Sequence, residues 1–327
     1  MRRRERRKNM NNGISHNRVV KMARLMVGLG IVGAASAVLL RVWMPTVTLL
    51  TVCVMLAVLL ALGGLVFLMR GGDRCEIVGK PSLMLSVMML VVGAAMVLHG
   101  GAEALARLGY IDFFTVAGNF ILQEDYAPLL SIVLPWLQTV FSVAGCIALV
   151  LAGLRVASEG GTRRGLAQVS MLAPVMWSWL ALANYMMTYT SMVRVTQGIF
   201  TLGMFVLEML FLFRFASYLA GVGKGGVGSL LFFSAGAATF VLSAPLVRLF
   251  LYLTQAGAAY SGMAGPLDLA VGLLALTVSI TLCQSLSAPV AVEESADEEA
   301  LEWEGLSDEE AVLELVEETD SEDFTEE

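Results

Sequence analysis

The sequence predicts an all-α, polytopic integral membrane protein with about eight transmembrane helices, both termini in the cytoplasm and a disordered, acidic C-terminal tail. Composition is the first observation behind this class. Of the 327 residues, 57% are hydrophobic and 15% are charged, whereas soluble domains have about 45–50% apolar and about 25% charged residues. The second observation is a series of apolar runs near the length of about 20 residues that a spanning helix needs.

The chain divides into a basic cytoplasmic N-terminal arm (residues 1–24), a transmembrane domain (residues 25–286) and an acidic cytoplasmic tail (residues 287–327). The eight predicted spans lie near residues 25–41, 45–69, 81–99, 128–153, 166–188, 198–219, 228–253 and 266–286. A proline in the first turn of a helix loses no hydrogen bond. Such prolines support four of the starts, at Pro45, Pro81, Pro128 and Pro266.

Basic residues are distributed unequally between the two sides of this arrangement. With the N-terminus inside, the inner segments hold 17 Lys and Arg residues and the outer segments hold 4. Because cytoplasmic segments are enriched in these residues, both termini are predicted to be cytoplasmic, which requires an even number of spans. The first apolar segment continues into a second span instead of ending at a cleavage site. We therefore predict a bacterial plasma membrane.

The longest outer connection, residues 100–126, is too polar to span the membrane and is rich in aromatic side chains. Aromatic rings concentrate at the membrane–water interface. The segment is therefore an interfacial helix, a lid over the outer face or a loop that lies on the surface without a role in ligand access. Its rings are those of Tyr110, Phe113, Phe114, Phe120 and Tyr126.

The sharpest candidate site is Glu208, near the middle of the sixth predicted span. A charge in hydrocarbon costs roughly 2.5–3.5 kcal/mol on insertion scales, so an intramembrane carboxylate indicates a functional site. Arg214 is six residues away, and facing pairs on a helix are three or four residues apart. Glu208 is therefore expected either to be protonated and donate a hydrogen bond or to line a hydrated cavity that admits ions.

Other polar residues are predicted to lie at a similar depth around Glu208: Gln138, Ser142, Ser178, Thr239 and Ser243. Interior prolines kink helices, and interrupted helices often line transporter sites. Pro135, Pro174 and Pro245 are predicted to lie inside spans, and Asn184, Tyr185 and Tyr189 to form an outer mouth. The alternative is ordinary packing, because membrane helices tolerate proline and a single polar residue can hold two helices together.

Motifs for enzymatic chemistry are not found in the sequence. Gly28, Gly30 and Gly33 have the spacing of a dinucleotide fingerprint, but they lie within an apolar span without the required strand–helix context. Small residues in a span usually allow close helix packing, which is the interpretation we adopt. We predict a non-enzymatic protein without a catalytic residue, cofactor or metal and without a nucleic-acid partner. The bilayer is its one certain contact.

The tail contains 18 of the 28 acidic residues, all within residues 293–327, and no Lys or Arg. Disorder is the default for such a composition. Trp303, Leu306, Leu315 and Phe324 are apolar anchors through which the tail is predicted to bind a cytoplasmic protein. The alternative is a solvated charge run that aids solubility.

Two classes of function remain open at this point. The first, which the separate tail and the absence of a transport motif favour, is a non-enzymatic sensor, scaffold or accessory subunit that contacts cytoplasmic partners. The second, favoured by the intramembrane acid and the interior prolines, is a small-solute permease, proton-linked through Glu208. The substrate, the partner and the oligomeric state are left open.

Overall fold

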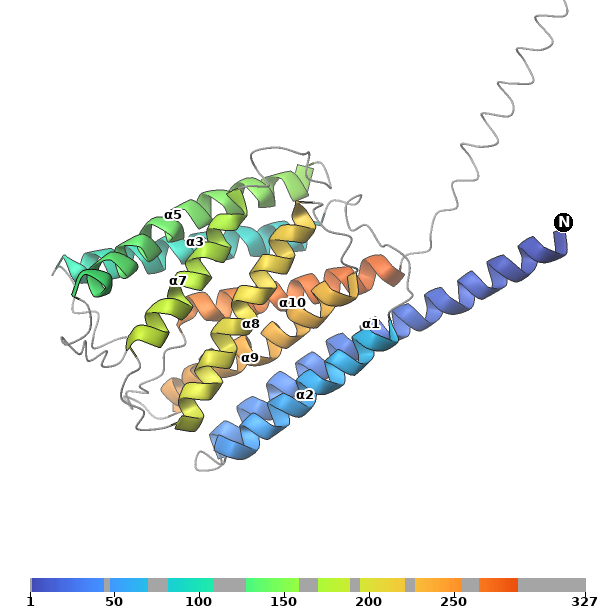
Figure 1. The fold of residues 1–327 in the computed structure, drawn as a ribbon, viewed down its shortest axis with the longest axis horizontal. Coiled ribbons are helices and arrows are strands. Elements are labelled where there is room, and N and C mark those ends of the chain that lie inside the picture. Colours follow the sequence, from blue (N-terminus) through green and yellow to red (C-terminus); the bar gives the residue numbers. More distant parts are fainter. Residues whose placement is uncertain are drawn as a thin grey trace, which may run out of the picture. The chain divides into compact units, whose positions relative to one another are not determined.

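The computed structural model describes residues 2–43, 48–69, 82–108, 128–158, 170–188, 195–220, 227–254 and 265–287, and every regular element within them is a helix. These helices belong to one compact unit, residues 1–287 (Figure 1). They are α1 (Arg2–Trp43), α2 (Thr48–Leu68), α3 (Leu83–Arg107), α5 (Pro128–Ser158), α7 (Leu172–Thr188), α8 (Val195–Leu219), α9 (Val227–Thr254) and α10 (Pro266–Ser287). The tail with its predicted anchors lies outside the described residues.

Seven of the described helices are long and apolar enough to cross a membrane. The eighth, α7, has 17 residues, and part of its predicted span, residues 166–169, lies outside the described residues. The predicted fold class, an all-helical multi-pass membrane protein, is therefore confirmed. The identity of the membrane and the sides on which the termini lie stay predictions.

Three boundaries differ from those predicted. Helix α1 begins at Arg2, so it is already helical well before the predicted start of the first span at residue 25. Helix α3 continues to Arg107, so the predicted outer connection from residue 100 starts as helix, because Ala and Leu after Gly101 are strong helix formers. Helix α7 begins at Leu172, which places Pro174 in its first turn. The predicted interior position of Pro174 is therefore wrong, since Pro174 is the third residue of α7.

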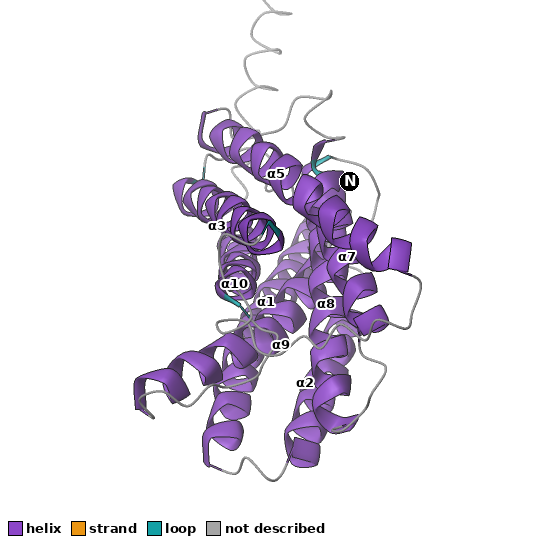
Figure 2. Cartoon of the chain, turned by 90° about the vertical axis from the view of Figure 1, so that its left-hand side faces the viewer, coloured by secondary structure: helices purple, strands orange, loops and turns teal. Residues whose placement is uncertain are grey.

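Helix α9 is the centre of the bundle. It packs against α1, α2, α8 and α10, while α3 pairs with α5 and α7 joins α5 to α8. Figures 1 and 2 show α3 beside α5 and α1 beside α2, with α1 extending past α2 toward the N-terminus. This arrangement places α8 between the α7 and α9 faces, which is where the candidate site lies.

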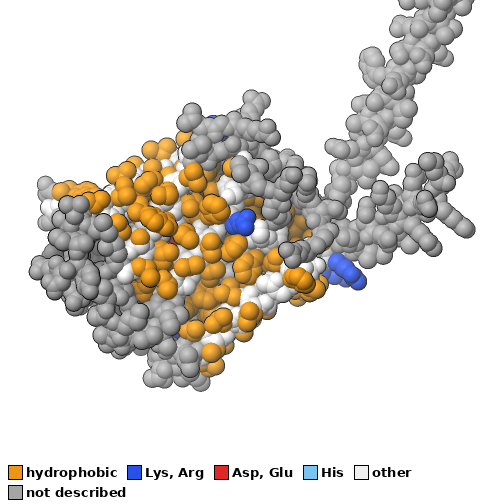
Figure 3. Space-filling model, viewed as in Figure 1, with side chains coloured by type: hydrophobic (Ala, Val, Ile, Leu, Met, Phe, Trp, Pro, Cys, Tyr) orange, Lys and Arg blue, Asp and Glu red, His pale blue; other side chains and the backbone are white. Residues whose placement is uncertain are grey.

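Burial separates α9 from the peripheral helix α2. Residues that are buried make up 83% of the spanning stretch of α9 and 17% of that of α2, although α2 is the more hydrophobic of the two. The sequence of α9 explains the difference, since its Gly, Ala and Ser residues let neighbouring helices approach closely. The Leu-rich α2 instead contributes exposed apolar side chains such as Leu56, Leu60 and Phe67. A broad apolar surface covers the face in Figure 3, as a lipid-facing surface requires.

Glycines mark the closest helix contacts. A Cβ atom added at Gly30 would lie 3.3 Å from the carbonyl oxygen of Ala235 on α9, and one at Gly33 would lie 3.0 Å from side-chain carbons of Thr239 and Val58. The close packing predicted from the glycine spacing is confirmed at these two positions. Gly28 has no such neighbour within 4 Å.

Candidate functional site

Glu208 lies in the buried stripe of α8. Met204, Phe205, Phe211 and Phe215 are three, four or seven residues from it, which places all of them on one face of the helix. The Glu208 side chain is 0% exposed, and neither carboxyl oxygen has a hydrogen-bond partner among the described residues. The sequence therefore places a carboxyl group on the buried face of α8, where it has no hydrogen-bond partner among the described residues.

A second buried acid, Asp268, lies on another helix that contacts α8. Asp268 is in the first turn of α10, and the backbone N–H of Gly265 donates a hydrogen bond to its carboxylate. Sequence reasoning did not group Asp268 with Glu208, because the two acids are 60 positions apart and only the fold shows that their helices contact each other.

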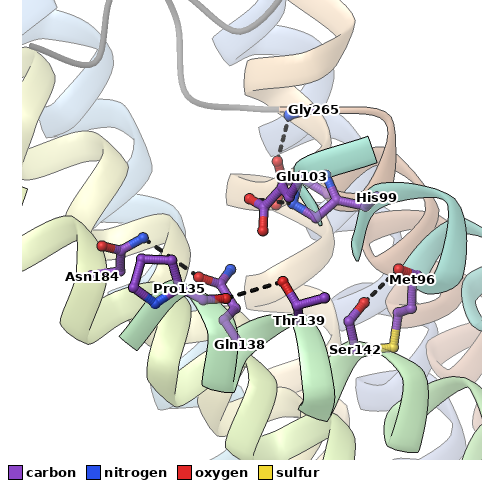
Figure 4. Close-up of polar contacts among 10 residues, drawn as sticks. Met96, His99, Glu103, Pro135, Gln138, Thr139, Ser142, Asn184 and Gly265 are labelled. Carbon is purple, nitrogen blue, oxygen red and sulfur yellow. Dashed lines mark hydrogen bonds and ion pairs between the residues drawn. The ribbon is translucent and has the colours of Figure 1, made fainter. Parts of the chain in front are cut away.

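Further polar side chains of α3, α5 and α7 are drawn in Figure 4. On α3, His99 Nε2 lies 3.3 Å from Glu103 Oε1. Between α5 and α7, the Asn184 side-chain amide donates to Gln138 Oε1 at 3.5 Å. Figure 4 shows the His99–Glu103 pair beneath Gly265, at the start of α10. We call His99, Glu103, Gln138, Asn184 and Asp268 the polar cluster.

The polar cluster lies toward one end of the bundle, and Glu208 lies deeper. At about 1.5 Å of rise per residue, Asp268 is roughly 3 Å from the start of α10 and Asn184 roughly 6 Å from the end of α7. Glu208 is roughly 20 Å from the start of α8 and near the middle of its spanning stretch, Phe200–Leu219. The polar cluster and the unpartnered carboxyl group thus lie at different depths in the bundle.

The predicted hydroxyl residues around Glu208 bond to the backbone. Ser178 donates to the carbonyl of Val175, Thr239 to that of Ala235 and Ser243 to that of Phe240, at 2.8 to 2.9 Å. All three residues are fully buried. Thr239 also bonds the Gly30 carbonyl of α1 at 3.1 Å. These hydroxyl groups serve helix packing.

Ser142 bonds between helices. Its hydroxyl on α5 donates to the carbonyl of Met96 on α3, where Gly100 leaves room for it. Gln138 contacts Asn184 at the edge of the polar cluster. That Ser142 and Gln138 belong to a site around Glu208 stays a prediction. The α3–α5 pair is thereby held by both a hydrogen bond and small residues.

Of the predicted outer mouth, only part lies within the described residues. Tyr185 is 5% exposed and packs its ring against Phe205 of α8, with 5.5 Å between ring centroids. Its neighbour Asn184 is partly buried in the contact with Gln138. Tyr189 lies outside the described residues. Tyr185 thus belongs to the interior beside the Glu208 face.

Trp177 is a site residue that sequence reasoning missed. Its ring on α7 is 2% exposed and meets His99 edge-on at 6.3 Å, and its indole N–H has no acceptor within the described part of the chain. A buried tryptophan usually finds a hydrogen-bond partner. The sequence signal available was a tryptophan inside an apolar span, which does not by itself distinguish a core position from a site.

No family model, curated protein or solved structure matches this chain. Within the described residues, no three His, Cys, Asp or Glu side chains are grouped to hold a metal ion. The chemistry of the site therefore follows from its residues: carboxyl groups on α3, α8 and α10 can exchange protons and attract positive charge.

Proposed function

We propose that this protein is a small-solute permease whose transport is linked to protons through Glu208. The observation that carries the proposal is the buried Glu208 carboxyl group, which has no hydrogen-bond partner in the described residues. Burying a polar group without a partner costs free energy, and ionisable residues inside membrane domains typically belong to ion or proton pathways. Glu208 therefore has a property that transport uses and that packing does not need.

The second acid supports the same function. Glu208 and Asp268 are buried acids on helices that contact each other, and burying a negative charge is costly unless the group takes up a proton or is paired. Proton uptake therefore lowers the cost of keeping these groups buried. The polar cluster lies nearer one end of the bundle, where it offers groups that a proton or a solute would meet before it reached Glu208.

The sensor, scaffold or accessory role rests on residues 293–327, which lie outside the described residues. Binding of a cytoplasmic protein by this tail stays a prediction, as do the bacterial plasma membrane and the non-enzymatic character of the chain. We place the permease first because the burial and the hydrogen bonding of its key residue, Glu208, are known from the structure. The two roles are compatible, since a tail that binds a partner can regulate a transport domain.

The proposal is tested with purified protein in liposomes that contain a trapped pH-sensitive dye. Amino acids, sugars, organic acids and amines are added outside one at a time, and proton movement is followed. We expect at least one solute class to drive proton flux with the wild type. Glu208→Gln should reduce that flux about tenfold or more, since it removes the exchangeable proton.

The matched control is Ser36→Ala on α1, whose hydroxyl bonds the Gly33 carbonyl of its own helix. This variant should retain the wild-type flux. The proposal would be overturned if Glu208→Gln retained the wild-type flux. It would also be overturned if none of the solute classes drove proton flux with correctly folded wild-type protein.

A further inference from the structure

Aromatic rings flank Glu208 on its own helix. Phe205 precedes it by three residues and Phe211 follows it by three, so the two rings lie about one turn to either side on the same face. Tyr185 of α7 packs against Phe205, and Phe211 stacks with Phe215 at 5.8 Å between ring centroids. All of these rings are buried. Aromatic side chains thus lie about one turn before and one turn after Glu208 on the buried side of α8.

The same helix face already holds a positive charge on an aromatic ring. The guanidinium carbon of Arg41, on α1, lies 3.6 Å from the ring centroid of Phe200, two turns before Glu208 on α8. Phe200 in turn stacks on Phe240 of α9, with 5.5 Å between centroids and planes within 19°. Cation–π attraction of this kind is strengthened where the cation is desolvated. The α8 face therefore accommodates a cation by aromatic contact.

The surroundings of Glu208 favour a particular kind of cation. Hard metal cations take about six to eight oxygen ligands and give up their water reluctantly. Next to Glu208 on α8, the side chains of Met204, Leu207 and Leu212 are buried carbon and sulfur. An organic cation with a spread charge and an apolar surface loses little hydration there, gains ring contacts and pairs with the carboxylate.

The charged groups near the site include both acids and bases. The helices that pack on α8 carry these titratable or charged residues: Cys53 on α2, Tyr185 on α7, Arg248 and Tyr252 on α9, and Asp268 and Cys283 on α10; α8 itself carries Arg214 and Tyr218. Among the described side chains of these helices, the buried acids are Glu208 and Asp268. Glu208 is the acid that a cation on the buried face of α8 would meet.

From this geometry we propose that Glu208 and the rings of Phe205, Phe211 and Tyr185 bind a lipophilic organic cation. The inference rests on the proposed transport function and names its substrate class. The cation and a proton compete for one carboxyl group: when the cation binds, the O–H bond of Glu208 breaks and the proton leaves to water, so one positive charge replaces another. Because Glu208 is fully buried, binding requires the helix packing around it to open.

The test is calorimetric titration of the full-length protein in detergent with tetraphenylphosphonium, accompanied by a pH indicator in weakly buffered solution. We expect saturable binding with release of about one proton per cation, and binding that weakens by up to about tenfold per pH unit on acidification, because protons compete. Glu208→Gln should weaken binding about tenfold or more and abolish proton release.

Ring variants test the aromatic part of the site. Phe205→Leu and Tyr185→Leu should each weaken binding about three- to tenfold, the size expected of a partly desolvated cation–π contact. Phe213→Leu is the matched control, since Phe213 is on the same helix but 46% exposed, and it should bind like the wild type. Size-exclusion profiles identical to that of the wild type establish that each variant is folded.

The outcomes separate this inference from the proposed function. Absence of tetraphenylphosphonium binding, or equal binding by Glu208→Gln, overturns the cation site. If a neutral or anionic solute nevertheless drives Glu208-dependent proton flux in liposomes, the permease proposal stands and the substrate class is wrong. If tetraphenylphosphonium binds with proton release but liposomes show no coupled flux, the cation site stands and the permease proposal is overturned.

Discussion

Helices α9 and α8 both contain buried polar side chains, but these side chains differ in their hydrogen bonding. On α9, Ser234, Thr239 and Ser243 are fully buried, and each hydroxyl donates to a carbonyl oxygen three or four residues earlier. On α8, Glu208 is equally buried, but its carboxyl oxygens have no partner in the chain as described. A hydroxyl group that donates to a carbonyl of its own helix costs little free energy when it is buried in a membrane. An unsatisfied carboxyl group destabilises the fold that contains it.

The comparison therefore divides buried polarity into two kinds. The polar residues of α9 belong to the packing of small side chains, and their removal should cost stability. Glu208 is outside that packing, and its removal should increase stability while abolishing function. Trade-offs of this kind are common at functional sites.

The largest effect is expected at the α9–α10 contact. A Cβ atom at Gly272 would lie 2.8 Å from side-chain carbons of Leu242 and 3.1 Å from its backbone nitrogen, so Gly272→Val should lower the free energy of unfolding by about 3 kcal/mol. Titration with SDS in mixed micelles measures this change in the free energy of unfolding. Gly64→Val on α2 is the control, because no atom lies within 4 Å there. Equal effects of both variants would mean that α9 is not the packing centre.

A stabilising effect is expected at Glu208. Glu208→Leu removes an unsatisfied buried polar group and places an apolar side chain among the apolar neighbours, so the free energy of unfolding should rise by about 1–3 kcal/mol. The same SDS titration detects this change, and Glu208→Gln should lie between Leu and the wild type. A loss of stability in Glu208→Leu would show that Glu208 belongs to the packing, and the contrast with α9 would disappear.

The smallest effects are expected for the hydroxyl groups of α9. Thr239→Val removes the hydrogen bond to Gly30 of α1 and should cost about 1 kcal/mol, within the range measured for bonds between membrane helices. Ser243→Ala removes a bond to its own helix and should cost about 0.5 kcal/mol or less. Thermal unfolding in detergent compares them. A larger loss for Ser243→Ala would mean that bonds within a helix, and not those between helices, hold α9 in place.

Much of the fold follows from the sequence because hydropathy is a local property. Apolar runs identify every described helix, and prolines mark the starts of α5 and α10 at Pro128 and Pro266. The ends of α1 and α3 were missed where the helix continues into polar sequence, as at Glu103. Mean hydropathy falls there because apolar residues become fewer, but the residues still favour a helix.

The candidate site follows from the sequence only in part. Glu208 is evident as an acid within an apolar run. The packing of Tyr185 against Phe205 is not, because it depends on which helix faces meet, a property of pairs of helices that single-span patterns do not encode. The position of Pro174 in the first turn of α7 is not evident from the sequence either, because it depends on where the helix begins.

The contact between Thr239 and Gly30 sets an order for assembly in the cell. The two residues are 209 positions apart, so at synthesis rates of about 5–20 residues per second α1 waits roughly 10–40 s before its partner surface on α9 exists. During that interval the glycine-bearing face of α1 adjoins lipid or an insertion factor. A nascent chain that stops before α9 lacks the surface that packs on this face of α1.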